Sequence, residues 1–239
     1  MSEQLQLSFE AGPEPVPHDP WAKWPIDVAP ADPRVIAAVR KSVDDAYRAS
    51  NRGAGIFREA MRLWWLTLDR YRLGAEEEYL EIVERIGPDA TRALAPGFAA
   101  LREHFFDTGG FADVLGIVYQ EVSSNWGRSA LGQFFTPWPI AMMLARLTIQ
   151  GEGGFEALKN GDIVKVCDPA CGSAVMLLAA RAVVASELGR SASSRVKCYG
   201  QDLDEVCTLM AKIQLRFADE RYMRNLFMTL AFELKEKSG

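Results

Sequence analysis

The chain has 239 residues, of which 49% are hydrophobic, and a net charge of −5 at pH 7. This length allows one sizeable hydrophobic core or two small ones, and no apolar run reaches the roughly 18 residues that a membrane span needs. The negative charge disfavours a free-standing nucleic-acid clamp, although a local basic patch helped by a partner would still allow DNA binding.

Cysteine and histidine usage indicates reduced thiols and no metal site. The cysteines lie in the last third of the chain, and none forms the Cys-x-x-Cys pair of a zinc knuckle. The only histidines are His18 and His104. The first residues hold no basic stretch leading into an apolar run, so we expect no secretory signal. We therefore expect a cytoplasmic protein with four reduced cysteines: Cys167, Cys171, Cys198 and Cys207.

Residues 1–33 form a proline-rich acidic segment. They contain seven of the twelve prolines, and six acidic residues against one basic residue, Lys23. This segment carries the whole net charge of −5, which leaves the remainder neutral. We expect an extended arm or a disordered tail, because proline lacks the backbone donor and apolar area is scarce. Trp21 and Trp24 are expected to dock, preferably on the protein's own surface and otherwise on a partner.

Residues 34–128 follow a helical pattern and are expected to form an all-helical domain. Apolar residues at helical spacing begin at Ile56 and continue through Leu68 to Tyr71, which predicts one amphipathic helix. Gly74 marks its end.

Further helices are predicted downstream within the same domain. The acidic run 76–78 suits the first turn of a helix, where carboxylates stabilise the helix dipole. Gly87-Pro88 and the Ala-Pro-Gly run 95–97 predict two helix boundaries. A later apolar stripe at positions i, i+3, i+4, i+7 and i+8 is expected to be core rather than a cofactor site. Its residues are Phe111, Val114, Leu115, Val118 and Tyr119.

The pattern changes in residues 129–239, where strands alternate with helices. We predict a strand over 163–167, a helix over 173–188, a strand over 196–199 and a helix over 204–217. This order and length are typical of the βαβ unit of a parallel, doubly wound sheet. The predicted fold class is therefore α/β, with an N-terminal helical domain followed by a partial Rossmann-like sheet.

The loop after the first strand has features of a ligand site. In open α/β sheets, ligands bind at the carboxyl ends of the strands. Asp168 at the strand tip can accept hydrogen bonds from a cationic group such as an ammonium, and Gly172 allows a bound molecule close to the backbone. The alternative is an ordinary strand-to-helix turn.

A second acidic residue follows the next strand. Asp202 can accept both hydroxyls of a ribose, as an acid in this position does in dinucleotide-binding folds. Asp204 is the rival candidate, but its place at a helix start favours a capping role. Asp168 and Asp202 together predict a pocket for an adenosine that bears a cationic tail.

A third segment, 131–137, precedes both loops. Pro137 and Pro139 suit the first turn of a helix. Phe134 and Phe135 just before it can stack on or shield a ligand. The alternative is a hydrophobic staple at a helix start.

These three segments resemble motifs of one family. Residues 133–137 (Gln-Phe-Phe-Thr-Pro), 168–173 (Asp-Pro-Ala-Cys-Gly-Ser) and 200–202 (Gly-Gln-Asp) are similar, in order and spacing, to those of N6-adenine DNA methyltransferases resembling the modification subunit of type I restriction systems. One departure is Ala174, where the family usually has another glycine.

The resemblance implies S-adenosylmethionine as the cofactor. By this likeness residues 133–137 would close over it, Asp168 would lie towards its methionine end, and Asp202 would hold its ribose. The full set of implied cofactor-binding residues is Gln133, Phe134, Phe135, Thr136, Pro137, Asp168, Ala170, Cys171, Gly172 and Asp202.

The catalytic residues of that family are not found in this sequence. Such enzymes extrude adenine from the duplex and hold it with a tetrapeptide of Asn or Asp, two prolines and an aromatic residue. The chain has no Pro-Pro dipeptide, and only 37 residues follow Asp202. The apolar run 226–232 fits either a strand or a helix. No catalytic residue is therefore assigned.

Two functions remain open at this point. The chain could supply the S-adenosylmethionine-binding part of an adenine-specific DNA methyltransferase, with a partner chain for catalysis and DNA recognition. Alternatively, it could be an inactive binding or regulatory module in a DNA-modification complex. In either case we expect the first strand to have an open edge that another segment or chain must cover.

Overall fold

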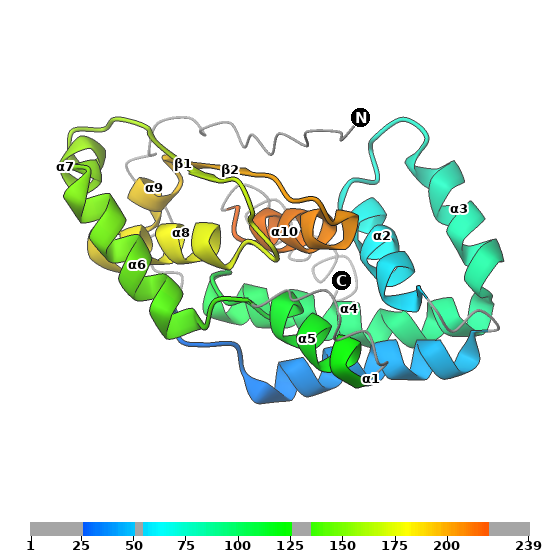
Figure 1. Ribbon diagram of the computed structural model, residues 1–239. Helices are drawn as coiled ribbons and strands as arrows, with labels where there is room; N and C mark the ends of the chain where they lie inside the picture. The colour runs from blue at the N-terminus through cyan, green and yellow to red at the C-terminus, as the bar shows by residue number, and fades with distance from the viewer. Residues whose placement is uncertain (1–25, 51–54, 126–134, 220–239) are drawn as a thin grey trace, which may run out of the picture.

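The computed structural model describes residues 26–50, 55–125 and 135–219. The described chain is mixed α/β and mostly helical, with one small parallel sheet (Figure 1). The elements in chain order are α1 (Pro33–Ala49), α2 (Ile56–Leu68), α3 (Ala75–Ile86), α4 (Pro88–Thr108), α5 (Leu115–Asn125), α6 (Trp138–Gly151), α7 (Gly154–Lys159), β1 (Val164–Asp168), α8 (Val175–Leu188), α9 (Arg190–Ser193), β2 (Val196–Gly200) and α10 (Glu205–Phe217).

Local sequence signals set most helix boundaries. The Asp32 side chain accepts a hydrogen bond from the Arg34 amide and caps α1. The acidic run 76–78 lies in the first turn of α3, as predicted, and Gly87 separates α3 from α4. The extension of α2 to Tyr71 was wrong. The helix ends at Leu68, and the following turn leaves Tyr71 88% exposed.

The predicted boundary at residues 95–97 was also wrong, because α4 continues through Pro96. The Ser42 hydroxyl of α1 accepts a hydrogen bond from the Gly97 amide at 3.0 Å and donates to the Ala93 carbonyl. An undistorted helix would join these two backbone groups to each other. A cross-helix contact thus satisfies the backbone next to the proline, and the helix does not have to end there.

The sheet consists of β1 and β2, which pair in parallel from Val164 opposite Val196 to Asp168 opposite Gly200. α8 connects the two strands and packs against one face of both (Figure 1). The predicted strands and helices of this region are present, with ends that differ by one or two residues. Within the described residues, β1 pairs with β2 alone, so its other edge has no strand beside it there.

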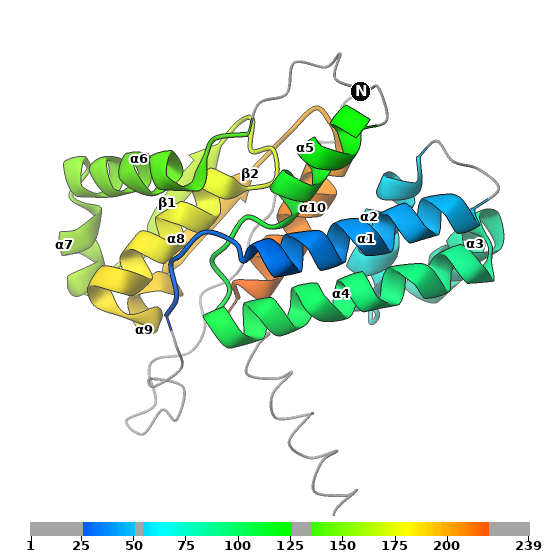
Figure 2. The same ribbon diagram turned by 90° about the horizontal axis from the view of Figure 1, so that it is seen from below.

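The buried side chains form two hydrophobic clusters that share α10. One face of α10 packs with the N-terminal helices through residues such as Met210 and Phe217. A second face places Ala211 and Leu215 with α8 and the sheet. Figure 2 shows α10 between these two parts of the molecule. α10 therefore joins the helical part to the sheet.

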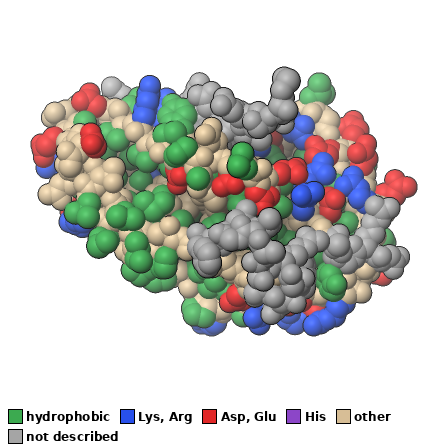
Figure 3. All heavy atoms as spheres, viewed as in Figure 1, with side chains coloured by type: hydrophobic (Ala, Val, Ile, Leu, Met, Phe, Trp, Pro, Cys, Tyr) green, Lys and Arg blue, Asp and Glu red, His purple; other side chains and the backbone are tan. Residues whose placement is uncertain are grey.

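Helix α6 carries apolar side chains on both its buried side and its exposed side. Trp138, Ala141, Ala145 and Ile149 are buried on one side. On the other side four large apolar side chains are exposed, and Figure 3 shows hydrophobic side chains gathered over α6. These are Ile140, Met143, Leu144 and Leu147. No helix among the described residues is long and apolar enough to cross a membrane.

Candidate cofactor site

The site lies where β1 and β2 end at the same edge of the sheet. Parallel pairing brings Asp168 opposite Gly200, and the loops that follow are hydrogen-bonded to each other. The Gln201 amide donates to the Asp168 carbonyl at 3.1 Å, and the Cys171 amide donates to the Gln201 carbonyl at 2.9 Å. The two loops therefore form one continuous surface beyond the strand ends.

Both strand-tip carboxylates lie on this surface and are partly buried. The Asp202 carboxylate accepts hydrogen bonds from the Gly172 amide and from the Asp204 amide, each at 2.9 Å. Asp168 accepts one from the Ala170 amide at 3.0 Å. Asp202 is thus fixed against the loop that carries Asp168, and the two acids lie on neighbouring, directly bonded loops.

Phe135 brings the first motif to the second. Gly172 has φ +52°, and a Cβ added there would lie 2.8 Å from Cε1 of Phe135. The aromatic ring therefore lies directly against the backbone of Gly172, which only glycine allows at this distance. The Phe135 ring also meets Tyr119 of α5 edge-on, with the ring centroids 6.0 Å apart. Gln133 and Phe134 lie outside the described residues.

The other motif residues divide into exposed and buried positions. Ala170 is exposed, whereas the Cys171 side chain is 2% exposed and points into the sheet core. Burial, aided by the charges of Asp202 and Asp168, raises the pKa of the Cys171 thiol to about 12. The Cys171 thiol is therefore part of the core and offers a ligand no thiolate.

The first motif ends at the start of α6. Thr136 is partly buried, and Pro137 is exposed at the N-cap of α6, with Pro139 in the first turn. The prediction that these prolines begin a helix is confirmed. Trp138, the next residue, donates from its indole nitrogen to the Val28 carbonyl at 2.8 Å. This bond ties the start of α6 to the segment before α1.

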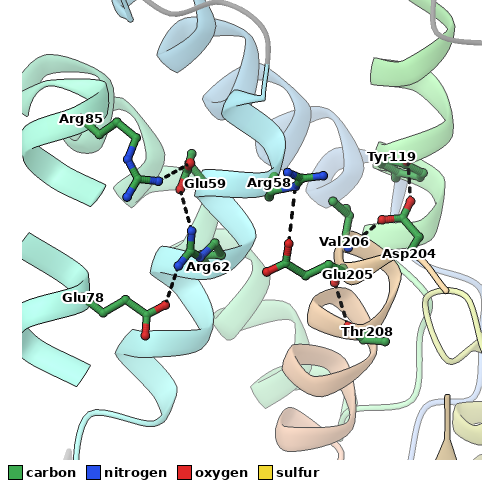
Figure 4. Close-up of polar contacts among 10 residues, drawn as sticks. All are labelled: Arg58, Glu59, Arg62, Glu78, Arg85, Tyr119, Asp204, Glu205, Val206 and Thr208. Carbon is green, nitrogen blue, oxygen red and sulfur yellow. Dashed lines mark hydrogen bonds and ion pairs between the residues drawn. The ribbon is translucent and has the colours of Figure 1, made fainter. Parts of the chain in front are cut away.

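Asp204 caps α10, as predicted. Its side chain accepts a hydrogen bond from the Val206 amide at 2.9 Å, and the Tyr119 hydroxyl lies 3.3 Å from its other oxygen (Figure 4). An ion pair at 3.7 Å between Arg58 of α2 and Glu205 supports the same end of α10. Asp204 therefore holds the start of α10, whereas Asp202 is bonded to the loop that carries Gly172.

Two features of the site were missed in the sequence. Leu203, directly after Asp202, is 99% exposed at the strand-end surface. Asp113 is 5% exposed and bonded to Ser173 of the first loop. A charged residue in the otherwise apolar run 111–118 was the available signal for Asp113. Among the described residues, no group of three or more His, Cys, Asp or Glu side chains could hold a metal ion.

Comparisons with known proteins agree on one family. The family model of N-6 DNA methylases matches residues 110–229, slightly more than half of the chain, and this match spans all three motifs. The methylase subunit of the type I restriction enzyme MpnII from Mycoplasma pneumoniae (strain ATCC 29342 / M129 / Subtype 1) is 30% identical over 105 residues. The match covers 44% of this chain and 17% of that protein. No solved structure matches.

Proposed function

Because the chain belongs to the N-6 DNA methylase family, we propose that it binds S-adenosylmethionine at the ends of β1 and β2. In this proposal β1, β2 and their helices are part of a Rossmann-like sheet, and the chain is the cofactor-binding part of an adenine-specific N6 DNA methyltransferase of restriction-modification type. The bonded pair of strand-end loops, which holds Asp168, Gly172 and Asp202 at one edge, carries the proposal.

The chemistry of these loops suits the two ends of the cofactor. A carboxylate offers about four acceptor sites, so Asp202 keeps capacity for ribose hydroxyls beside its two bonds to backbone amides. Asp168 supplies negative charge for the ammonium of the methionine part. Phe135 offers an aromatic face next to Gly172. When bound, S-adenosylmethionine would supply the transferable methyl group on its sulfonium sulfur.

Methyl transfer itself is proposed to need residues that this chain does not supply. No Pro-Pro dipeptide occurs in the sequence, so residues outside this sequence would hold the extruded adenine and recognise the DNA. The exposed apolar side of α6 supports a partner chain, since a helix that is apolar on both sides is normally covered on both. The alternative is an inactive binding or regulatory module of a DNA-modification complex. A cytoplasmic location stays a prediction.

Calorimetric titration of the purified chain with S-adenosylmethionine tests the proposal. We expect binding, and we expect Asp202→Asn to weaken it by about tenfold or more, which corresponds to about 1.4 kcal/mol. Asp162→Asn is the matched control, because Asp162 is exposed just before β1, at the opposite end of the sheet. It should bind like the wild type. A folded wild-type chain that gives no heat of binding would refute the proposal.

The same preparation distinguishes the two forms of the proposal. With tritiated S-adenosylmethionine and duplex DNA, the chain alone should transfer no methyl group to adenine. Activity that appears when co-purifying proteins are added back would favour the enzyme part over the inactive module. Full activity of the single chain would show that the catalytic residues had been missed.

A further inference from the structure

A buried carboxylate lies directly beneath the first loop of the site. Asp113, just before α5, is 5% exposed and accepts three hydrogen bonds. The donors are the Gly116 amide at 3.0 Å, the Gln214 side-chain amide at 2.9 Å and the Ser173 hydroxyl at 2.9 Å. Buried carboxylates are rare unless their oxygens are paired in this way. The bond to Ser173 links residues 60 positions apart.

Gln214 of α10 completes this buried network. Its side-chain oxygen accepts from the amides of Val114 and Leu115, at 2.8 and 3.0 Å. Its side-chain nitrogen donates to Asp113 and also to the Ser173 carbonyl at 2.8 Å. Ser173 is therefore held through its hydroxyl by Asp113, before α5, and through its carbonyl by Gln214 of α10.

The packing at this point leaves no spare room. A Cβ on Gly116 would lie 2.4 Å from both Oδ2 of Asp113 and Oγ of Ser173. Since real Cβ atoms do not approach other atoms so closely, the network needs glycine at this position. The network therefore leaves no space for a side chain at position 116.

The loop that the network holds has an unfavourable backbone. Gly172 has φ +52° and Ala174 has φ +77°, and Ser173 lies between them. A non-glycine residue in this region costs about 1–2 kcal/mol, so contacts outside the loop must fix its shape. Two such contacts flank Gly172. On the site surface, Asp202 accepts a hydrogen bond from the Gly172 amide. In the interior, Asp113 accepts one from the hydroxyl of the next residue, Ser173.

The region around α5 touches all three motif loops. Tyr119 of α5 contacts Phe135 of the first motif and Asp204, two residues after the acid of the third. Asp113, just before the same helix, accepts a hydrogen bond from Ser173 of the second motif. We propose that Asp113 is a positioning residue for the methyl-donor site, which acts through Ser173 to keep the Gly172 amide directed at Asp202. This role rests on the proposed function for its effect on cofactor binding.

Hydrogen exchange of the ligand-free chain tests the positioning itself. Asp113→Asn keeps the shape of the side chain but leaves the network with a surplus donor. We expect amides in the peptide 169–174 to exchange about tenfold faster in this variant, as the loss of one buried hydrogen bond allows. Ser173→Ala, which removes the same contact from the other side, should give a similar increase.

Ser42→Ala is the matched control, because it removes a buried hydrogen-bonded side chain far from the loop, between α1 and α4. It should lower thermal stability while leaving exchange in peptide 169–174 unchanged. Unchanged exchange in Asp113→Asn and Ser173→Ala, or an equal increase in the control, would overturn the inference. Should Asp113→Asn fail to fold, Ser173→Ala decides the question alone.

Calorimetry then measures the consequence for the cofactor. S-adenosylmethionine should bind Asp113→Asn about tenfold more weakly than the wild type, and bind Ser42→Ala normally at a temperature where all variants are folded. Equal affinities for all three proteins would refute a role in the site. If the wild type binds no S-adenosylmethionine, the proposed function fails, while the exchange comparison still decides whether Asp113 positions the loop.

Discussion

At the scale of single residues, Ala174 is buried with a left-handed backbone conformation that residues other than glycine disfavour. Its φ of +77° is the only positive value at a non-glycine position among the described residues. The side chain is fully buried, in the sheet core. Relief of the strain in Ala174→Gly gains about 1–2 kcal/mol. The lost methyl group costs about 0.8 kcal/mol, and the extra freedom of the unfolded chain costs about 0.4–1 kcal/mol more.

Since these terms nearly cancel, Ala174→Gly should change the free energy of unfolding by less than about 1 kcal/mol. The matched control is Ala179→Gly, which removes a fully buried methyl group from regular α8 backbone. In Ala179→Gly the lost burial and the lower helix propensity of glycine both reduce the free energy of unfolding, by about 2 kcal/mol together. Urea unfolding of both variants measures the difference. Equal losses would show that the backbone at Ala174 is not strained.

At the scale of elements, α4 shows a helix kept intact by its neighbour. Pro96 cannot donate a backbone hydrogen bond, and the Ser42 hydroxyl bridges the nearby Gly97 amide and Ala93 carbonyl. We expect Ser42→Ala to destabilise the protein by about 1–3 kcal/mol, the cost of leaving buried backbone groups unpaired. In a Pro96→Ala background the helix can bond its own backbone, so the same change should cost less. Additive losses in a double-mutant cycle by urea unfolding would contradict this account.

The same elements show what could be predicted from the sequence. Both strands and the two long helices α8 and α10 were predicted to within one or two residues, because their apolar periodicity is local, whereas the short helix α9 was not predicted. The expected break at Pro96 was wrong because its remedy comes from Ser42, more than fifty residues away. Asp113 was missed for the same reason, since its partners Ser173 and Gln214 are 60 and 101 positions distant.

At the scale of the whole molecule, α10 joins the helical part and the sheet into one structure. Phe217 stacks on Phe105 of α4 at a centroid distance of 5.2 Å, and Leu215 lies in the sheet cluster. A Cβ on Gly110 would lie 2.9 Å from the Phe217 carbonyl oxygen, so the chain before α5 packs tightly on the end of the same helix. Separation of the two parts would expose one apolar face of α10, which makes cooperative unfolding the expected behaviour.

We therefore predict that the slowest-exchanging amides of α4 and α8 report the same free energy of unfolding. S-adenosylmethionine at a hundred times its Kd should raise both values by about 2.7 kcal/mol, although α4 is not part of the proposed site. Phe217→Ala should lower both by about 3–5 kcal/mol, as truncation of a buried aromatic side chain usually does. Hydrogen exchange followed by mass spectrometry measures both helices in one experiment. If the cofactor protected α8 and left α4 unchanged, the two parts would unfold independently, and α10 would not couple the helical part to the site.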